Sequence, residues 1–86
     1  MPTVCDEEIQ NRIIALDGMI LSFDQEVDIA LSNGGFHNTY FSDTYDRLKN
    51  EYIKIGTYLM QKNMYPRDGR DIGSKLMRLK LICLRG

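Results

Sequence analysis

Hydrophobic residues recur along the first third of the chain at alternating intervals of four and three positions. The stripe consists of Ile9, Ile13, Leu16, Ile20, Phe23, Val27 and Ala30. This spacing is typical of a helix that packs against another helix along one face. Residues 4–33 contain no proline, and Asn33 and Gly34 favour the left-handed conformation in which many helices end. We therefore expect a helix over residues 4–33, capped at its start by Thr3 and Asp6.

A second stripe with the same spacing follows a short segment that contains two glycines. Its members are Phe41, Tyr45, Leu48, Tyr52, Ile55 and Leu59. They predict a helix over residues 39–62. Two long helices joined by a short turn form an antiparallel hairpin, with the two stripes facing each other.

Pro66 and the turn dipeptide that begins at Asp68 interrupt this pattern after the second helix. A third stripe then consists of Ile72, Leu76, Leu79 and Cys83. It predicts a helix over residues 71–84, which Asp71 or Asp68 can cap. The expected fold is a single all-α domain over residues 1–86. In it, an antiparallel two-helix hairpin carries a shorter third helix, as in a three-helix bundle, and dimerisation is left open.

The two long helices carry more apolar residues than one packing stripe requires. Off the stripes lie Ile14, Gly18 and Leu21 in the first helix and Ile53, Gly56 and Met60 in the second. A glycine inside a helix costs about 1 kcal/mol relative to alanine, so these glycines indicate that a third body packs closely there. The third helix is the favoured body, and a second chain is the alternative.

The third helix has an apolar surplus of its own. Its second stripe consists of Met77, Leu81 and Leu84. One groove of a hairpin cannot cover two stripes of a short helix. An apolar stripe that stays uncovered commonly marks an interface, so this stripe predicts contact with another molecule.

Charge is distributed unevenly, although the net charge of the whole chain is only −1. Residues 1–35 carry seven acidic side chains and one basic one, whereas residues 62–86 carry seven basic side chains and two acidic ones. The simpler interpretation is that these two surfaces attract each other within the bundle. The alternative is that the basic end meets an acidic partner.

The sequence also bounds the class of protein. No apolar run reaches the roughly 18 residues of a membrane span, and the first residues lack both the basic and the apolar region of a secretory signal. We therefore expect a cytoplasmic protein that does not enter a membrane.

Residues with catalytic or metal-binding chemistry are few. Cys5 and Cys83 lie near opposite ends of the chain, and two cysteines alone do not form a zinc site. The single histidine, His37, lies in a glycine-rich turn, where a lone histidine is most often an ordinary turn residue. We expect no enzymatic activity, no cofactor and no metal. If the third helix runs parallel to the first, the cysteines lie too far apart for a disulfide, which predicts two free thiols.

Binding modules are the functional classes that remain. The preferred hypothesis is a small protein–protein interaction module that acts as an adaptor, a chaperone or an inhibitor, such as a phage encodes against a host enzyme. The alternative is a small nucleic-acid-binding protein that uses the basic segment 62–85. A pI of about 5.7 and an apolar third helix argue against this alternative. The residues expected to contact the partner are Met64, Tyr65, Arg67, Arg70, Lys75, Met77, Arg78, Leu81, Leu84 and Arg85.

Overall fold

Three helices make up most of the computed structural model, which describes residues 2–34, 38–67 and 71–83. The elements, in chain order, are β1 (Thr3–Val4), α1 (Glu7–Asn33), α2 (Asn38–Lys62), β2 (Met64–Tyr65) and α3 (Ile72–Cys83). The fold is all-α, as the hydrophobic pattern predicts, apart from two strands of two residues each. The molecule is elongated and measures 49 × 17 × 17 Å.

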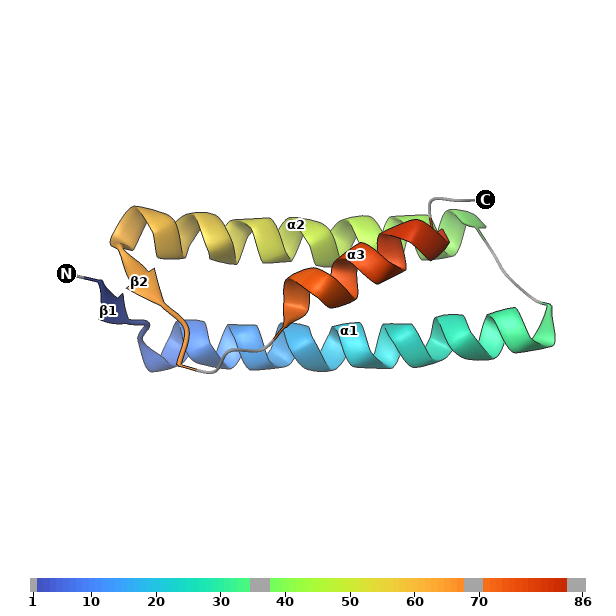
Figure 1. Cartoon of the computed structure of the whole chain (residues 1–86), viewed down its shortest axis with the longest axis horizontal. Helices are drawn as coiled ribbons and strands as arrows, with labels where there is room; N and C mark the ends of the chain where they lie inside the picture. The colour runs from blue at the N-terminus through green and yellow to red at the C-terminus, as the bar shows by residue number, and fades with distance from the viewer. Residues whose placement is uncertain (1, 35–37, 68–70, 84–86) are drawn as a thin grey trace.

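The helices form a rod with a shorter helix laid along it (Figure 1). α1 runs away from the end at which the chain begins, and α2 lies beside it and brings the chain back. α3 starts about halfway along the rod, lies over the groove between α1 and α2, and runs in the same direction as α1. It contacts both long helices.

The first helix begins later than its sequence predicts. Its N-cap is Asp6, whose carboxylate accepts a hydrogen bond of 2.9 Å from the backbone N–H of Ile9. The expected helix start at residue 4, with Thr3 as the cap, is therefore wrong. The physical reason is that residues 3–5 pair with another segment of backbone and so take an extended conformation.

That pairing is a short parallel ladder between β1 and β2. Thr3 is aligned with Met64, and Val4 with Tyr65. The N–H of Cys5 donates to the carbonyl of Tyr65 at 2.8 Å, and the N–H of Thr3 donates to the carbonyl of Asn63, just after α2, at 3.1 Å. The ladder ties the start of the chain to the segment that leads into α3.

The other helix ends agree closely with the sequence prediction. Gly34 caps α1 in the left-handed conformation, with φ of 70°, and its N–H reaches two carbonyls of the last turn. α2 begins one residue before its predicted start and ends at Lys62 as predicted. Asp71 caps α3, since its carboxylate accepts a hydrogen bond of 3.3 Å from the N–H of Ser74. The predicted end of α3 at residue 84 and the alternative cap at residue 68 lie outside the described residues.

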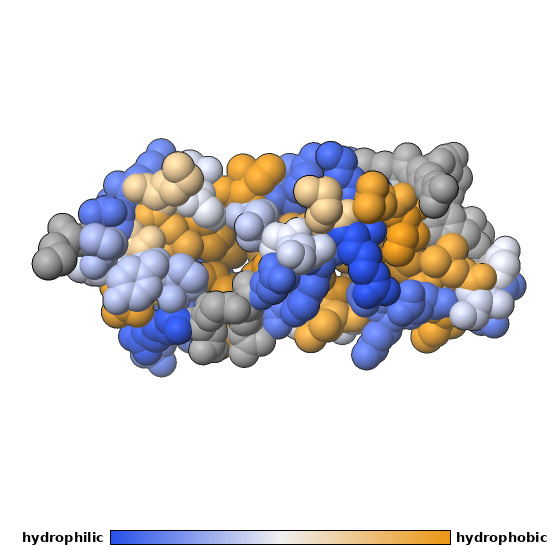
Figure 2. Space-filling view, in the orientation of Figure 1, coloured by the Kyte–Doolittle hydropathy of each residue, from blue (hydrophilic) through white to orange (hydrophobic). Residues whose placement is uncertain are grey.

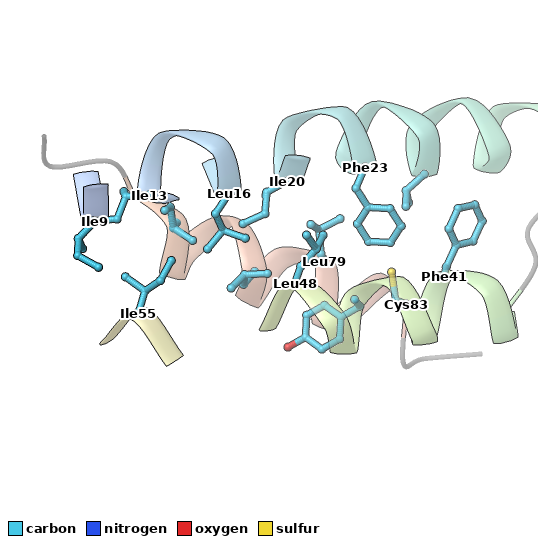
Figure 3. Close-up of a cluster of buried hydrophobic side chains, with 14 of the residues drawn as sticks. Ile9, Ile13, Leu16, Ile20, Phe23, Phe41, Leu48, Ile55, Leu79 and Cys83 are labelled. Carbon is cyan, nitrogen blue, oxygen red and sulfur yellow. The ribbon is translucent and has the colours of Figure 1, made fainter. Parts of the chain in front are cut away.

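The three predicted stripes meet in one core (Figure 3). Its buried members from α1 are Ile9, Ile13, Leu16, Ile20, Phe23 and Val27, those from α2 are Phe41, Tyr45, Leu48 and Ile55, and those from α3 are Ile72, Leu76, Leu79 and Cys83. The rings of Phe23 and Phe41 lie 5.8 Å apart in a tilted arrangement. Burial of these side chains is the main favourable contribution to folding.

Two predicted core residues of α2 are not fully buried. Tyr52 is exposed and Leu59 is half-buried. α3 covers the groove only from Ile72 onward, and Tyr52 lies beside its first turn, with its hydroxyl oxygen 3.2 Å from the position of a Cβ built on Gly73. The second stripe predicts that both side chains face the core, which is wrong for Tyr52 and only partly correct for Leu59. The reason is that α3 begins beside Tyr52 and runs away from Leu59 toward the other end of the rod (Figure 1).

Leu16 and Ile20 lie at the centre of this core and are almost completely buried. Truncation of either side chain to alanine leaves a cavity that the surrounding helices cannot fill. We expect Leu16→Ala or Ile20→Ala to lower the free energy of unfolding by about 2–5 kcal/mol, measured by urea denaturation followed by circular dichroism. Leu21→Ala, at an exposed position of the same helix, serves as the control and should change stability by less than about 1 kcal/mol. Equal effects at buried and exposed positions would contradict this core.

Both cysteines are buried and free. Cys5 follows β1 at one end of the rod, whereas Cys83 ends α3 near the other end. Burial raises the pKa of the Cys83 thiol, because the apolar surroundings disfavour the thiolate. We expect two thiols per unreduced chain in denaturant, and slow reaction of Cys83 with a thiol reagent at pH 8 in the folded protein. Fewer than two thiols in denaturant, or fast reaction of Cys83 in the folded state, would contradict the arrangement of α3.

Candidate protein-binding surface

Ion pairs join the acidic helix α1 to the basic helix α3. The ammonium of Lys75 lies 2.7 Å from the carboxylate of Asp17, whose side chain is only 4% exposed. The guanidinium of Arg78 lies 3.3 Å from Asp24 and 3.6 Å from Asp28. The uneven charge distribution therefore serves attraction within the bundle, which was the simpler of the two interpretations.

These ion pairs give a different role to two of the basic residues that were expected to contact a partner. Lys75 and Arg78 are engaged with carboxylates of their own chain, so they are not free cations on the rim of a binding site. Arg67 is exposed and contributes its backbone N–H to a contact within the chain. Arg70, Leu84 and Arg85 lie outside the described residues.

The second stripe of α3 is uncovered, as its sequence predicts. Met77 is 59% exposed and Leu81 is 67% exposed, although Leu76 and Leu79 of the same helix are buried. In the view of Figure 2, apolar residues lie on either side of polar residues at the middle of the molecule. The core stripe thus fixes α3 on the rod, and the opposite side of the helix presents two flexible apolar side chains to solvent.

A small apolar depression lies beside the start of α3, between α1 and α2. Its volume is about 190 Å³, and its lining consists of Ile13, Leu16, Tyr52, Ile55, Gly56, Leu59, Pro66 and Ile72. A Cβ built on Gly56 meets no atom within 4 Å, so glycine leaves this wall open. Sequence reasoning missed the depression, although the unexplained glycine in the second helix was a signal of it.

The loop before α3 is only partly exposed. Tyr65 is half exposed, whereas Met64 packs against the core. The amide oxygen of buried Gln10 accepts a hydrogen bond of 2.8 Å from the N–H of Arg67, and it lies 3.4 Å from the sulfur of Cys5. Gln10 therefore holds the loop against the start of α1, a role that its polar side chain did not reveal in the sequence.

The third helix is not the body that packs on both off-stripe glycines. A Cβ built on Gly18 or on Gly56 meets open space within 4 Å. The two glycines also line different hollows, since Gly56 faces the depression near α3, whereas Gly18 lines a wide groove on another side of the rod. The expectation that α3 covers them was wrong, because α3 lies along the groove and reaches neither position.

That second groove runs between α1 and α2 and has a volume of about 1050 Å³. Phe23 and Leu48 line its floor. Arg12 and Glu51 form an ion pair of 2.7 Å between its two walls. Its rim is more polar than that of the depression, so it is the weaker candidate for an apolar partner.

Other kinds of site are not evident in the part of the chain that the structure describes. Within residues 2–34, 38–67 and 71–83, no three histidine, cysteine, aspartate or glutamate side chains come together in a way that could hold a metal ion. None of the helices described is both long and apolar enough to cross a membrane. Comparison with known protein families, with curated proteins and with solved structures finds no match for this chain.

The pair between Lys75 and Asp17 offers a direct test of how α3 is held. Lys75→Met removes the cation but keeps the aliphatic stem, which leaves the buried carboxylate without its partner. We expect a loss of about 1–3 kcal/mol in the free energy of unfolding, less than for a fully buried pair because Lys75 is partly exposed. Arg78→Met, at a more exposed pair, should cost less than about 1 kcal/mol. A larger loss for Arg78→Met than for Lys75→Met would contradict this ranking.

Proposed function

We propose that this protein is a protein–protein interaction module that acts by binding rather than by catalysis, as an adaptor, a chaperone or an inhibitor does. Its binding site is the α3 surface, which we define as Met77, Leu81 and the depression beside Gly56. The observation that supports this proposal is the uncovered stripe on a helix whose opposite stripe is fully packed. An apolar patch of this kind on a small domain commonly marks an interface.

The way in which α3 is held favours binding without rearrangement. Its core stripe is buried, its first turn is capped by Asp71, and two of its cations pair with α1. Met77 and Leu81 are thus presented on a helix whose position is already fixed, which reduces the ordering cost of binding. Methionine is common at interfaces because its side chain adapts to different partners.

The depression offers a place for an anchor side chain of the partner. Its volume of about 190 Å³ is of the size of one large apolar side chain, and its lining is apolar apart from the Tyr52 hydroxyl. Anchors that fill such pockets carry much of the binding energy at protein interfaces. We therefore expect the partner to insert a leucine or an aromatic residue beside Gly56.

Nucleic acid is the less supported ligand. Two of the cations that would contact phosphates are already paired with carboxylates, and the exposed face of α3 carries apolar side chains where base-reading groups would be needed. A protein partner held by apolar contacts should bind with little dependence on salt. Nucleic-acid binding would instead weaken steeply as salt increases.

Leu81→Ser tests the site directly, because it removes an exposed apolar side chain without disturbing the core. The partner is first captured from the native host and identified, and its affinity for each variant is then measured by titration calorimetry. We expect Leu81→Ser to weaken binding by about 30-fold or more, which corresponds to about 2 kcal/mol. The matched control is Leu31→Ser, at a leucine of α1 that is 49% exposed. An equal effect of both substitutions, or none from Leu81→Ser, would place the site elsewhere.

A charge reversal separates the two ligand classes. Lys80 lies in the last turn of α3 and is exposed, and no ion pair of the described residues involves it, so its reversal leaves the fold intact. With a protein partner, Lys80→Glu should mainly change the association rate and its dependence on salt. If Lys80→Glu abolishes binding while Leu81→Ser does not, and the bound species is nucleic acid, the alternative function is correct.

A further inference from the structure

Between residues 11 and 32, the part of α1 that lies directly opposite its buried stripe carries no charged side chain, although Arg12, Glu26 and Asp28 are exposed beside it. Its exposed residues, which we call the neutral face, are Asn11, Ile14, Ala15, Gly18, Leu21, Ser22, Gln25, Ile29 and Ser32. At 3.6 residues per turn they occupy an arc of about 120° on the side opposite the buried stripe. Surface helices normally carry charged side chains on the side opposite the core, so this composition is unusual.

The charged residues at the edges of the neutral face have contacts within the chain. Arg12 pairs with Glu51, and Asp28 pairs with Arg78. The hydroxyl of Tyr40 donates a hydrogen bond to the carboxylate of Glu26, which raises the pKa of Tyr40. Arg12 and Asp28 therefore have opposite charges beside them within the chain, and Glu26 has a hydrogen-bond donor.

The outer side of α2 is different. Its exposed residues include the charged side chains of Asp43, Asp46, Arg47 and Lys54. This is the composition expected of a helix that faces water. The contrast between two helices of similar length in the same rod indicates that the outer side of α1 is normally covered.

The neutral face also has the shape of a helix-packing surface. Ile14, Leu21 and Ile29 are all exposed on it, so α1 is apolar on two opposite sides. Gly18 lies at its centre without a side chain, and a Cβ built on it meets no atom within 4 Å. Glycine at such a point lets a second helix approach closely and receive a large side chain.

We propose that the neutral face is the interface of a homodimer in which α1 packs antiparallel against α1 of a second copy. Leu21 follows Gly18 by three residues, or about 4.5 Å along the helix. A two-fold axis that passes between them places Leu21 over Gly18 of the partner subunit, and the same contact is made twice. In this register Glu7 lies opposite Ser32 of the partner subunit, so no like charges meet at the ends of the interface.

Charge decides between a second copy and other occupants. A helix that lies on a membrane carries lysine or arginine beside its apolar side, whereas Glu26 and Asp28 lie at the edges here. Nucleic acid requires cations that the neutral face lacks. A charged group of a partner that lies over the uncharged residues would lose hydration without gaining a counter-charge. The neutral face of a second copy of this chain needs no cations and brings no charge that would lose its hydration.

The proposal concerns a different surface from the α3 surface and does not rest on it. A contact limited to one helix face lies at the lower end of stable interface sizes, so we expect a dissociation constant of about 10–100 µM. Sedimentation equilibrium of the full chain from about 1 µM to about 1 mM covers this range. The wild-type protein should pass from monomer to dimer as its concentration rises.

Leu21→Glu tests the interface, since it places two like charges beside each other across the two-fold axis. We expect dimerisation to weaken by about 100-fold or more. The matched control is Ile53→Glu on α2, because Ile53 is 52% exposed and Leu21 is 46% exposed. The control should change the dissociation constant by less than about two-fold. An equimolar mixture of Leu21→Glu and Leu21→Lys should recover association, which loss of folding cannot explain.

Gly18→Ala provides a second test that does not depend on folding of a charged variant. Within one chain the added methyl group meets nothing, so thermal stability at low protein concentration should rise. At the proposed interface the same group occupies the space that Leu21 of the partner subunit needs, so dimerisation should weaken by about tenfold or more. A purely structural role for Gly18 cannot produce these opposite signs.

Three results would overturn the proposal. The wild-type protein could remain monomeric up to about 1 mM, or Gly18→Ala and Leu21→Glu could leave its dimerisation unchanged. A dimer that is lost in Leu81→Ser but kept in Leu21→Glu would assign the contact to the α3 surface instead. If Leu81→Ser does not affect binding of the heterologous partner, the proposed function is contradicted but the proposed dimer is not. The two proposals can therefore fail separately.

Discussion

The difference in length between the helices is the constraint on which the rest of the structure depends. α1 and α2 contain 27 and 25 residues, whereas α3 contains 12. At 1.5 Å per residue, α3 is about 18 Å long and lies over a groove of about twice that length. The uncovered part of the groove is partly closed by the β1–β2 ladder and by the loop that carries Pro66. The depression beside Gly56 is the space that neither α3 nor this loop fills.

Electrostatics then determines which surfaces are left for other molecules. Lys75 and Arg78 of α3 pair with acidic side chains of α1. The Lys75–Asp17 pair fixes the position of α3 along the rod. Beside these paired charges, α1 and α3 expose apolar side chains such as Leu21 and Leu81. Contacts of this kind are governed by shape and by removal of apolar area from water, and salt affects them weakly.

Much of the core could be predicted from the sequence, because a periodic apolar stripe specifies the buried side of a helix wherever that helix lies. This holds for α1 and α3, and it fails at Tyr52 and Leu59 of α2. Whether those two residues are covered depends on where α3 begins, and periodicity within α2 contains no such information. The β1–β2 ladder was also missed, since strands of two residues are too short to show an alternating pattern.

In the candidate surfaces, too, features that follow from a local sequence pattern could be predicted, and features that depend on distant elements could not. The exposed stripe of α3 could be predicted, because a short helix with two apolar stripes cannot bury both. The roles of Gln10 and Asp17 could not, since each depends on a partner 57 or 58 residues away. The depression beside Gly56 could not be predicted from the sequence for another reason. It results from the absence of a covering element, and a local sequence pattern does not report what is missing.

The ladder between β1 and β2 has a consequence for the order of folding. It joins residues that are about 60 positions apart, so closing it early would cost the entropy of a loop that contains both long helices. α1 and α2 must first pair along their length, because only then do Thr3 and Met64 arrive at the same end of the rod. Once formed, the ladder fixes the start of the chain to the segment that follows α2. The segment before α3 then has little freedom left, and docking of α3 becomes a short local search.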